Sequence, residues 1–181
     1  MAFEDRAIDV EPLIAGSALQ RRIDELAEAI AKDMPPTMVV VGILTGSFVF
    51  VADLVRALDR HGLAPDVRFV QLASYFDGTE STGEVQVLGS LSGSFEGRAV
   101  LVVDDIQDTG RTLAMAKRIL EDRGAKHVRT CALLDKPSRR VLEFQADYVG
   151  FTIPDVFVVG YGIDYAERFR HLPYIGQING D

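Results

Sequence analysis

The chain has 181 residues, of which 48% are hydrophobic and 25% charged, so it can bury an ordinary core and is not intrinsically disordered. The 19 basic and 27 acidic side chains give a formal net charge of −8, which argues against a general nucleic-acid binder, because affinity for the phosphate backbone needs clustered cations. The single cysteine, Cys131, excludes an internal disulfide framework and a cysteine-cluster metal site.

No apolar stretch approaches the roughly 18 residues of a membrane span, and no signal-like segment follows Met1. We therefore expect one domain over residues 1–181, located in the cytoplasm, with neither membrane nor nucleic acid as a partner. The first predicted element is a helix over about 17–34, where apolar side chains recur on one helical face.

The next elements alternate between strand and helix. Residues 38–44 form a β-branched run without alternation, which is typical of a strand covered on both faces. After a turn at 45–47, apolar residues at helical spacing predict a helix that ends near Gly62, and a strand is expected at about 67–72. The polar segment 74–84 lacks any period and predicts a long mobile loop.

The second half of the chain repeats the unit of strand, loop and helix. We expect strands at 85–88 and 99–103, a helix over about 112–123, and further strands at about 128–134 and 156–159. This alternation predicts an α/β fold with a central, mostly parallel sheet and helices on both faces.

Three carboxylates follow the predicted strand 99–103 within five residues. In such sheets ligands collect beyond the carboxyl ends of the strands, so Asp104, Asp105 and Asp108 are candidate site residues. Capping of the following helix would account for Asp108 or Thr109. It does not account for Asp104 and Asp105, because adjacent like charges after an apolar run repel unless hydroxyl donors or a cation relieve them.

The residues that follow suit a phosphate. Thr109, Gly110 and Thr112 offer two hydroxyls and backbone amides at a predicted helix start. Carboxylates that can bind a sugar diol therefore lie next to groups that can bind a phosphate. This combination favours a ribose-5-phosphate site over simple capping of the helix. The sequence has no P-loop consensus, the segment 160–162 lacks the third glycine of a dinucleotide fingerprint, and the histidines are isolated, which argues against those nucleotide-binding and metalloprotease classes.

Residues 100–113 (Val-Leu-Val-Val-Asp-Asp-Ile-Gln-Asp-Thr-Gly-Arg-Thr-Leu) resemble the phosphoribosyl pyrophosphate signature of the type I phosphoribosyltransferases. Further segments, in the same order, resemble the hypoxanthine-guanine branch of that family. They are 44–47, 74–75 with 78–83, 134–140 and 157–175. The resemblance covers about residues 38–176 and implies the family's fold, with a small hood beside the sheet and a mobile active-site loop.

The resemblance also implies a role for each matching residue. Asp104 and Asp105 correspond to the acids that meet the ribose hydroxyls and magnesium, and Asp108 to the general base or acid at purine N7. The 5′-phosphate site corresponds to Asp108, Thr109, Gly110, Arg111 and Thr112.

The remaining matches surround the purine and the pyrophosphate. The purine residues are Lys136 at the 6-oxygen, Phe157 stacked on the base, Val158 with its main chain at the purine edge, and Asp164, which is also linked to metal. The pyrophosphate residues are Thr45, Gly46 and Arg170, and the flexible loop starts at Ser74 and Tyr75. Two positions depart from the family: Thr45 replaces a lysine or arginine found in some members, and Asp104 replaces a frequent glutamate.

The implied reaction is Mg²⁺-dependent transfer of a 5-phosphoribosyl group from phosphoribosyl pyrophosphate to hypoxanthine or guanine, which gives IMP or GMP and pyrophosphate in purine salvage. The resemblance implies a homodimer or homotetramer. A xanthine- or pyrimidine-preferring enzyme and a non-catalytic RNA-binding regulator remain alternatives, although pyrimidine members generally lack the acid at the position of Asp108. The sequence does not rank hypoxanthine, guanine and xanthine.

Overall fold

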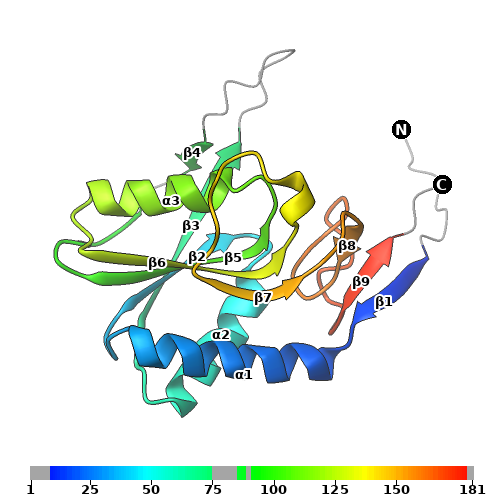
Figure 1. The fold of residues 1–181 in the computed structure, drawn as a ribbon, viewed down its shortest axis with the longest axis horizontal. Coiled ribbons are helices and arrows are strands. Elements are labelled where there is room, and N and C mark those ends of the chain that lie inside the picture. Colours follow the sequence, from blue (N-terminus) through cyan, green and yellow to red (C-terminus); the bar gives the residue numbers. More distant parts are fainter. Residues whose placement is uncertain (1–8, 75–84, 89–90, 179–181) are drawn as a thin grey trace.

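The computed structural model describes residues 9–74, 85–88 and 91–178. Within these residues, six strands form the main sheet in the order β4-β3-β2-β5-β6-β7 (Figure 1). Their bounds are Val39–Leu44 (β2), Asp66–Ser74 (β3), Val85–Leu88 (β4), Ala99–Gln107 (β5), His127–Asp135 (β6) and Tyr148–Thr152 (β7). Neighbouring strands are parallel except at the edge, where β4 runs antiparallel to β3. The central, mostly parallel sheet is therefore confirmed.

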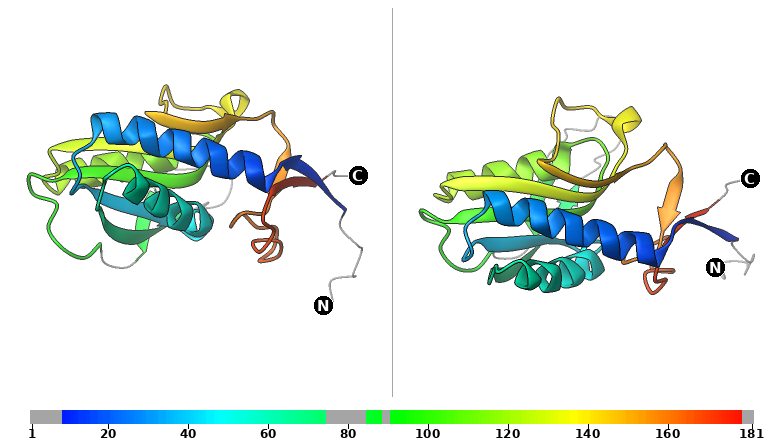
Figure 2. Two further views of the ribbon diagram at one scale, coloured as in Figure 1. Left: turned by 90° about the horizontal axis from the view of Figure 1, so that it is seen from below. Right: turned by 60° about the horizontal axis from the view of Figure 1, so that its bottom comes forward.

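Helices cover both faces of this sheet, as the alternation predicts. The helices α1 (Gly16–Asp33) and α2 (Phe48–Arg60) lie on one face, and α3 (Arg111–Asp122) lies on the other (Figures 1 and 2). Separate apolar clusters fill the two faces, because successive strand residues point in opposite directions. Both faces of β2 are covered, so its run of apolar residues needs no polar alternation.

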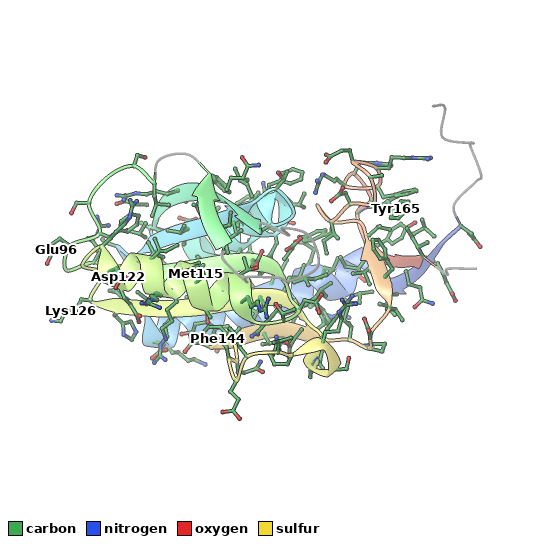
Figure 3. All side chains as sticks on the ribbon, turned by 90° about the horizontal axis from the view of Figure 1, so that it is seen from above. Glu96, Met115, Asp122, Lys126, Phe144 and Tyr165 are labelled. Atoms are coloured by element: carbon green, nitrogen blue, oxygen red, sulfur yellow. The ribbon has the colours of Figure 1, made fainter. Side chains whose placement is uncertain are left out.

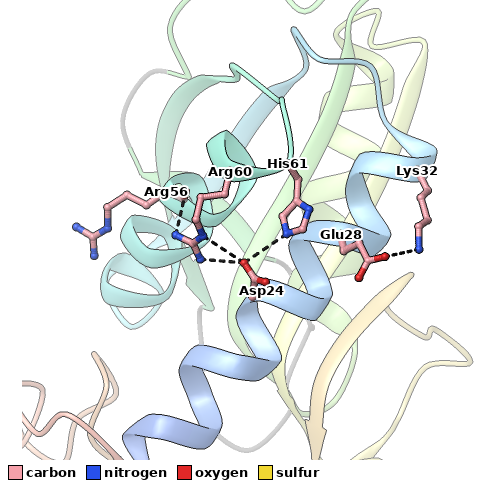
Figure 4. Close-up of polar contacts among 6 residues, drawn as sticks. All are labelled: Asp24, Glu28, Lys32, Arg56, Arg60 and His61. Carbon is pink, nitrogen blue, oxygen red and sulfur yellow. Dashed lines mark hydrogen bonds and ion pairs between the residues drawn. The ribbon is translucent and has the colours of Figure 1, made fainter.

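Exposed ion pairs lie on the surface of the layer formed by α1 and α2. Asp24 of α1 accepts a hydrogen bond from Arg60 at 2.9 Å and lies 3.3 Å from Nε2 of His61, while Glu28 pairs with Lys32 at 2.7 Å along α1 (Figure 4). Such exposed pairs contribute little to stability, so the apolar contacts between the helices and the sheet hold this layer in place.

Cys131 lies in β6 and is fully buried. Burial raises the pKa of its thiol to about 12, so the residue is a small apolar component of the core. No helix in the described part of the chain is long and apolar enough to cross a membrane.

A second, smaller sheet forms the hood, which lies beside the carboxyl ends of the parallel strands (Figure 1). Its antiparallel strands are β1 (Val10–Ile14), β9 (Ile175–Ile178) and β8 (Phe157–Val159), in the order β1-β9-β8. Register partners such as Val10 and Ile178 bring distant parts of the chain together. The expected loop 74–84 lies outside the described residues, apart from Ser74, which ends β3.

Candidate active site

The strand β5 is longer than the apolar run 99–103 indicates. It continues to Gln107, because Asp104, Ile106 and Gln107 pair with residues of β6. The sequence had suggested that Asp104 and Asp105 lie in the loop after the strand. In the structure they lie within the strand itself. Backbone pairing with a central neighbour outweighs the poor strand propensity of aspartate.

The two adjacent carboxylates are desolvated. Asp104 is only 6% exposed, and its burial together with the neighbouring Asp105 raises its pKa well above the usual value. Burial also raises the pKa of Asp105, although the backbone amide of Ile106 and the charge of Arg170 oppose the rise. Hydroxyl donors or a cation at this pair would relieve the cost of holding two charges there.

The turn between β2 and α2 packs directly on Asp105. A Cβ atom at Gly46 would lie 1.8 Å from Oδ2 of Asp105, so only glycine leaves room for the carboxylate. The preceding peptide bond, between Leu44 and Thr45, is cis. The structure thus brings the expected pyrophosphate turn, Thr45 and Gly46, against the acid pair.

The segment 160–172, here called the arm, reaches the same turn from the hood. A Cβ atom at Gly162 would lie 2.3 Å from the carbonyl oxygen of Gly46, so the two backbones touch. Arg170 donates to the carbonyl of Gly162 at 2.8 Å and pairs with Asp164 at 3.0 Å. The arm therefore places its cation, and the carboxylate paired with it, beside the turn that carries Gly46.

The three acids expected to bind metal do not gather at one point. In the described ranges, no group of three or more His, Cys, Asp or Glu side chains is close enough to hold one metal ion. Asp164 is engaged by Arg170 and accepts the backbone N–H of Glu167 at 2.8 Å.

The start of α3 is open to an anion. Its N-cap is Gly110, at φ +86°, with no side-chain hydrogen bond to the cap and no acid in the first turn. Thr109 Oγ1 accepts the N–H of Arg111 at a long 3.4 Å. Most first-turn amides thus remain available, and helix capping does not explain the acids before them.

The carboxylate of Asp108 is the nearest acid to this helix start. Its Oδ1 is buried and accepts no hydrogen bond, although Nε of Arg139 lies 3.0 Å away. Such an oxygen can accept a proton or a hydrogen bond from a ligand.

Residues 136–142, here called the strap, form hydrogen bonds with the backbone of the loop before α3. Backbone N–H groups of the strap donate to the carbonyls of Gln107 at 3.0 Å and Thr109 at 3.1 Å, and Nη1 of Arg140 donates to the carbonyl of Asp108 at 2.7 Å. Three successive carbonyls thus point to the strap, and Arg140 in turn forms a buried ion pair with Asp135.

The sequence identified Lys136 of the strap as a purine residue, but not the contacts by which the strap holds the loop before α3. Its Lys-Pro-Ser-Arg-Arg run resembles an ordinary basic turn, and only the consecutive arginines after a buried strand could have indicated a structural role.

The expected purine residues belong to the strap, to the hood strand β8 and, for Asp164, to the arm. Lys136 is buried, and its Nζ donates to the carbonyl of Val156 at 2.7 Å, just before β8. Phe157 is 52% exposed and packs edge-to-face on Tyr165, with 5.4 Å between ring centroids. Val158 follows on β8, an edge strand of the hood whose backbone is paired on one side only.

These residues share one end of the molecule. Figure 3 shows Tyr165 at the end of the molecule opposite to Lys126, which precedes β6. The structure therefore brings together residues from four segments that are far apart in the sequence: the turn at 45–46, the end of β5, the strap and the arm. Tyr75, the remaining expected residue, lies outside the described residues.

Comparison with known proteins identifies the group to which this arrangement belongs. The phosphoribosyl transferase domain family matches residues 10–166. A hypoxanthine phosphoribosyltransferase of Escherichia coli K12 is 45% identical over 172 residues, which cover 93% of this chain and 95% of the relative. A hypoxanthine-guanine phosphoribosyltransferase of Staphylococcus epidermidis is 43% identical over 170 residues, with 93% of each chain covered.

A solved structure agrees with these sequence relatives. The crystal structure of a hypoxanthine phosphoribosyltransferase from Staphylococcus aureus has a TM-score of 0.86 and 42% identity, and the match covers 93% of this chain and 91% of that chain. The resemblance found in the sequence is thereby confirmed. The chain belongs to the phosphoribosyl transferase domain family, within the group of hypoxanthine and hypoxanthine-guanine phosphoribosyltransferases.

Proposed function

We propose that this protein transfers the 5-phosphoribosyl group of phosphoribosyl pyrophosphate to N9 of hypoxanthine or guanine and releases pyrophosphate, a reaction of purine salvage. The observation that carries the proposal is the desolvated pair Asp104 and Asp105 directly before an open helix start, in a chain of this family. The relatives named for hypoxanthine and guanine support the choice of base.

The phosphoribosyl group would be held from two sides. The open amides of α3, with the hydroxyls of Thr109 and Thr112, suit the 5′-phosphate dianion. Asp104 and Asp105 suit the ribose diol, because hydroxyl donors satisfy carboxylates that the protein itself leaves largely desolvated. The strap keeps the loop between these two subsites in place.

The same acid pair fits magnesium. Mg²⁺ in such sites is bound by one or two carboxylates together with substrate oxygens, so Asp104 and Asp105 provide a sufficient protein contribution. Bound magnesium supplies charge neutralisation on the leaving pyrophosphate.

The proton transfer is assigned to Asp108. Its buried Oδ1, which is ion-paired with Arg139, would exchange a proton with purine N7, which makes N9 nucleophilic in synthesis and the base a leaving group in reverse. Lys136 would donate to the 6-oxygen of the purine, and the exposed ring of Phe157 would stack on the base.

The leaving group is assigned to the turn after β2 and to the arm. Backbone amides of Thr45 and Gly46 and the guanidinium of Arg170 would stabilise the charge that develops on pyrophosphate. Thr45 contributes no charge, so Arg170 carries more of the electrostatic role. A loop that starts at Ser74 and Tyr75 would close over the reaction and exclude water.

A spectrophotometric assay with phosphoribosyl pyrophosphate and Mg²⁺ tests the proposal. Hypoxanthine, guanine, xanthine, adenine and uracil are supplied in turn, and we expect turnover with hypoxanthine and guanine. Absence of turnover with every purine would overturn the proposal, and turnover with uracil alone would identify a pyrimidine enzyme. Filter binding of RNA without turnover would identify a regulator.

We further expect a cytoplasmic homodimer or homotetramer. Analytical ultracentrifugation of the purified protein measures the oligomeric state, and a monomer over the whole concentration range would contradict the expectation.

A further inference from the structure

The proposed pyrophosphate subsite is assembled from two separate elements. The turn with Thr45 and Gly46 directly precedes α2, whereas Asp164 and Arg170 belong to the arm, which follows the hood strand β8. Backbone contact between Gly46 and Gly162 joins the two elements at the subsite. The distance between turn and arm therefore decides whether both can reach one ligand.

A hydrogen-bond cluster joins the same two elements away from the subsite. The hydroxyl of Tyr161, in the arm, donates to Oδ2 of Asp53 on α2. Gln20 of α1 donates to the same Oδ2 at 3.0 Å and to the Tyr161 oxygen at 3.2 Å, and Arg56 pairs with the other carboxylate oxygen of Asp53. One carboxylate on α2 thus fixes a side chain of the arm.

Burial and the charge of Asp53 strengthen the hydrogen bonds of this cluster. Tyr161 is 4% exposed, and the Asp53 side chain is also mostly buried. Burial alone would raise the pKa of Asp53, but hydrogen bonds from Tyr161, Gln20 and Arg56 together lower it. The carboxylate is therefore charged at neutral pH, and a hydrogen bond to a charged acceptor is stronger than one between neutral groups.

Tyr161 also connects to both ends of the arm through its backbone. It lies between Gly160 and Gly162, with a left-handed φ of +53°, and its N–H donates to the carbonyl of Leu172 at 2.9 Å. The next amide, that of Gly162, donates to the carbonyl of Arg170 at 3.0 Å. A shift of Tyr161 would therefore carry Arg170 with it.

We propose that Asp53 and Tyr161 are positioning residues that hold the arm against α2 and so set the spacing between Gly46 and Arg170 that pyrophosphate requires. This inference rests on the proposed function. Neither residue lies among those expected to touch the substrates, and both act through the groups that do. Loss of their hydrogen bond should weaken the pyrophosphate side of the site more than the purine side, because Lys136, Phe157 and Val158 lie outside the arm.

Tyr161→Phe removes only the hydroxyl and provides the principal test. We expect the KM for pyrophosphate, measured in the reverse reaction from IMP, to rise about tenfold, since a hydrogen bond to a charged group is worth at least that factor. The KM for hypoxanthine should rise much less. Asp53→Ala should act as Tyr161→Phe does, whereas Asp53→Asn keeps an acceptor oxygen but loses the charge, so its KM for pyrophosphate should lie between those of the wild type and Asp53→Ala.

Tyr148→Phe is the matched control. Tyr148 of β7 donates to Asp33 of α1 at 2.7 Å, so this variant breaks a tyrosine–aspartate hydrogen bond between other elements. It should leave both KM values unchanged.

The positioning role is overturned if an active wild type gives a Tyr161→Phe variant with an unchanged KM for pyrophosphate. It is also overturned if that variant raises the KM for hypoxanthine equally, or if Tyr148→Phe has the same effect. A wild type without purine turnover overturns the proposed function and this inference with it.

Discussion

Asp108 has one buried carboxylate oxygen that accepts no hydrogen bond, beside the helix start proposed for the 5′-phosphate. We predict that Asp108→Asn lowers kcat about 10²–10⁴-fold, the usual contribution of a positioned general acid or base. The KM for phosphoribosyl pyrophosphate should change little, because the phosphate is proposed to bind to backbone amides at the start of α3. Steady-state kinetics in both directions measure the two effects, and unchanged turnover would remove the assignment of Asp108 as the base.

Lys136 is buried, and its ammonium group donates a hydrogen bond to the carbonyl of Val156, the residue before the hood strand β8. We predict that Lys136→Ala raises the KM for hypoxanthine and guanine about 10–100-fold, which is the loss of one hydrogen bond from a charged donor. The KM for pyrophosphate should stay near the wild-type value. Lys126→Ala, an exposed change before β6, is the matched control and should alter neither constant. Equal losses for base and pyrophosphate would contradict recognition of the 6-oxygen.

Side-chain chemistry was predictable where it was local in the sequence. Adjacent Asp104 and Asp105 after an apolar run indicated an acid pair that binds hydroxyl groups or a cation, because repulsion there needs a ligand or a cation to offset it. The contact between Asp53 and Tyr161 was not predictable, since 108 residues separate the two and no motif includes Asp53. Only the fold brings them together.

At the level of elements, the strap depends on one ion pair. Arg140 and Asp135 are both largely buried, and Arg140 also binds the carbonyl of Asp108. We predict that Arg140→Ala lowers the free energy of unfolding by about 3–5 kcal/mol, because it leaves the Asp135 charge buried without its partner. Urea denaturation measures this value. The half-exposed neighbour Arg139, changed to Ala, should cost below about 1 kcal/mol, and equal costs for both variants would contradict the prediction.

The elements that the sequence predicted have clear apolar periodicity, and those it missed depend on distant partners. The strand β7 contains Gly150, where a Cβ atom would lie 2.4 Å from the carbonyl of Leu133, so close packing against β6 requires a residue that weakens any strand pattern. The strands β1 and β9 are short and pair only with each other and with β8. Pairing between distant segments leaves no local signal.

At the scale of the whole molecule, Asp147 makes stability sensitive to acid. It accepts hydrogen bonds from the backbone and hydroxyl of buried Thr130 and from Arg129, which also pairs with Asp33 of α1. Burial would raise the pKa of Asp147, but these bonds together hold it below the usual 3.8. A depressed pKa contributes stability above about pH 4, and that contribution is lost as the pH falls through the folded-state pKa.

We therefore predict that Asp147→Ala costs about 2 kcal/mol at pH 7, where charged hydrogen bonds are lost and Thr130 keeps unpaired donors. The difference from the wild type should shrink steadily below pH 4, since the wild type then loses the same charge. Urea denaturation across this pH range measures both curves. A difference that stays constant down to pH 2 would contradict the assignment.

The hood sheet has a consequence for biosynthesis. Its middle strand, β9, pairs with β1, so segments near residues 10 and 178 must meet before the sheet exists. A chain that emerges from the ribosome can pair its parallel strands early, whereas β1 waits without a partner until β9 has been translated. The hood sheet can therefore be completed only after residues 175–178 have been translated, and a nascent chain arrested before residue 175 should have a folded main sheet without transferase activity.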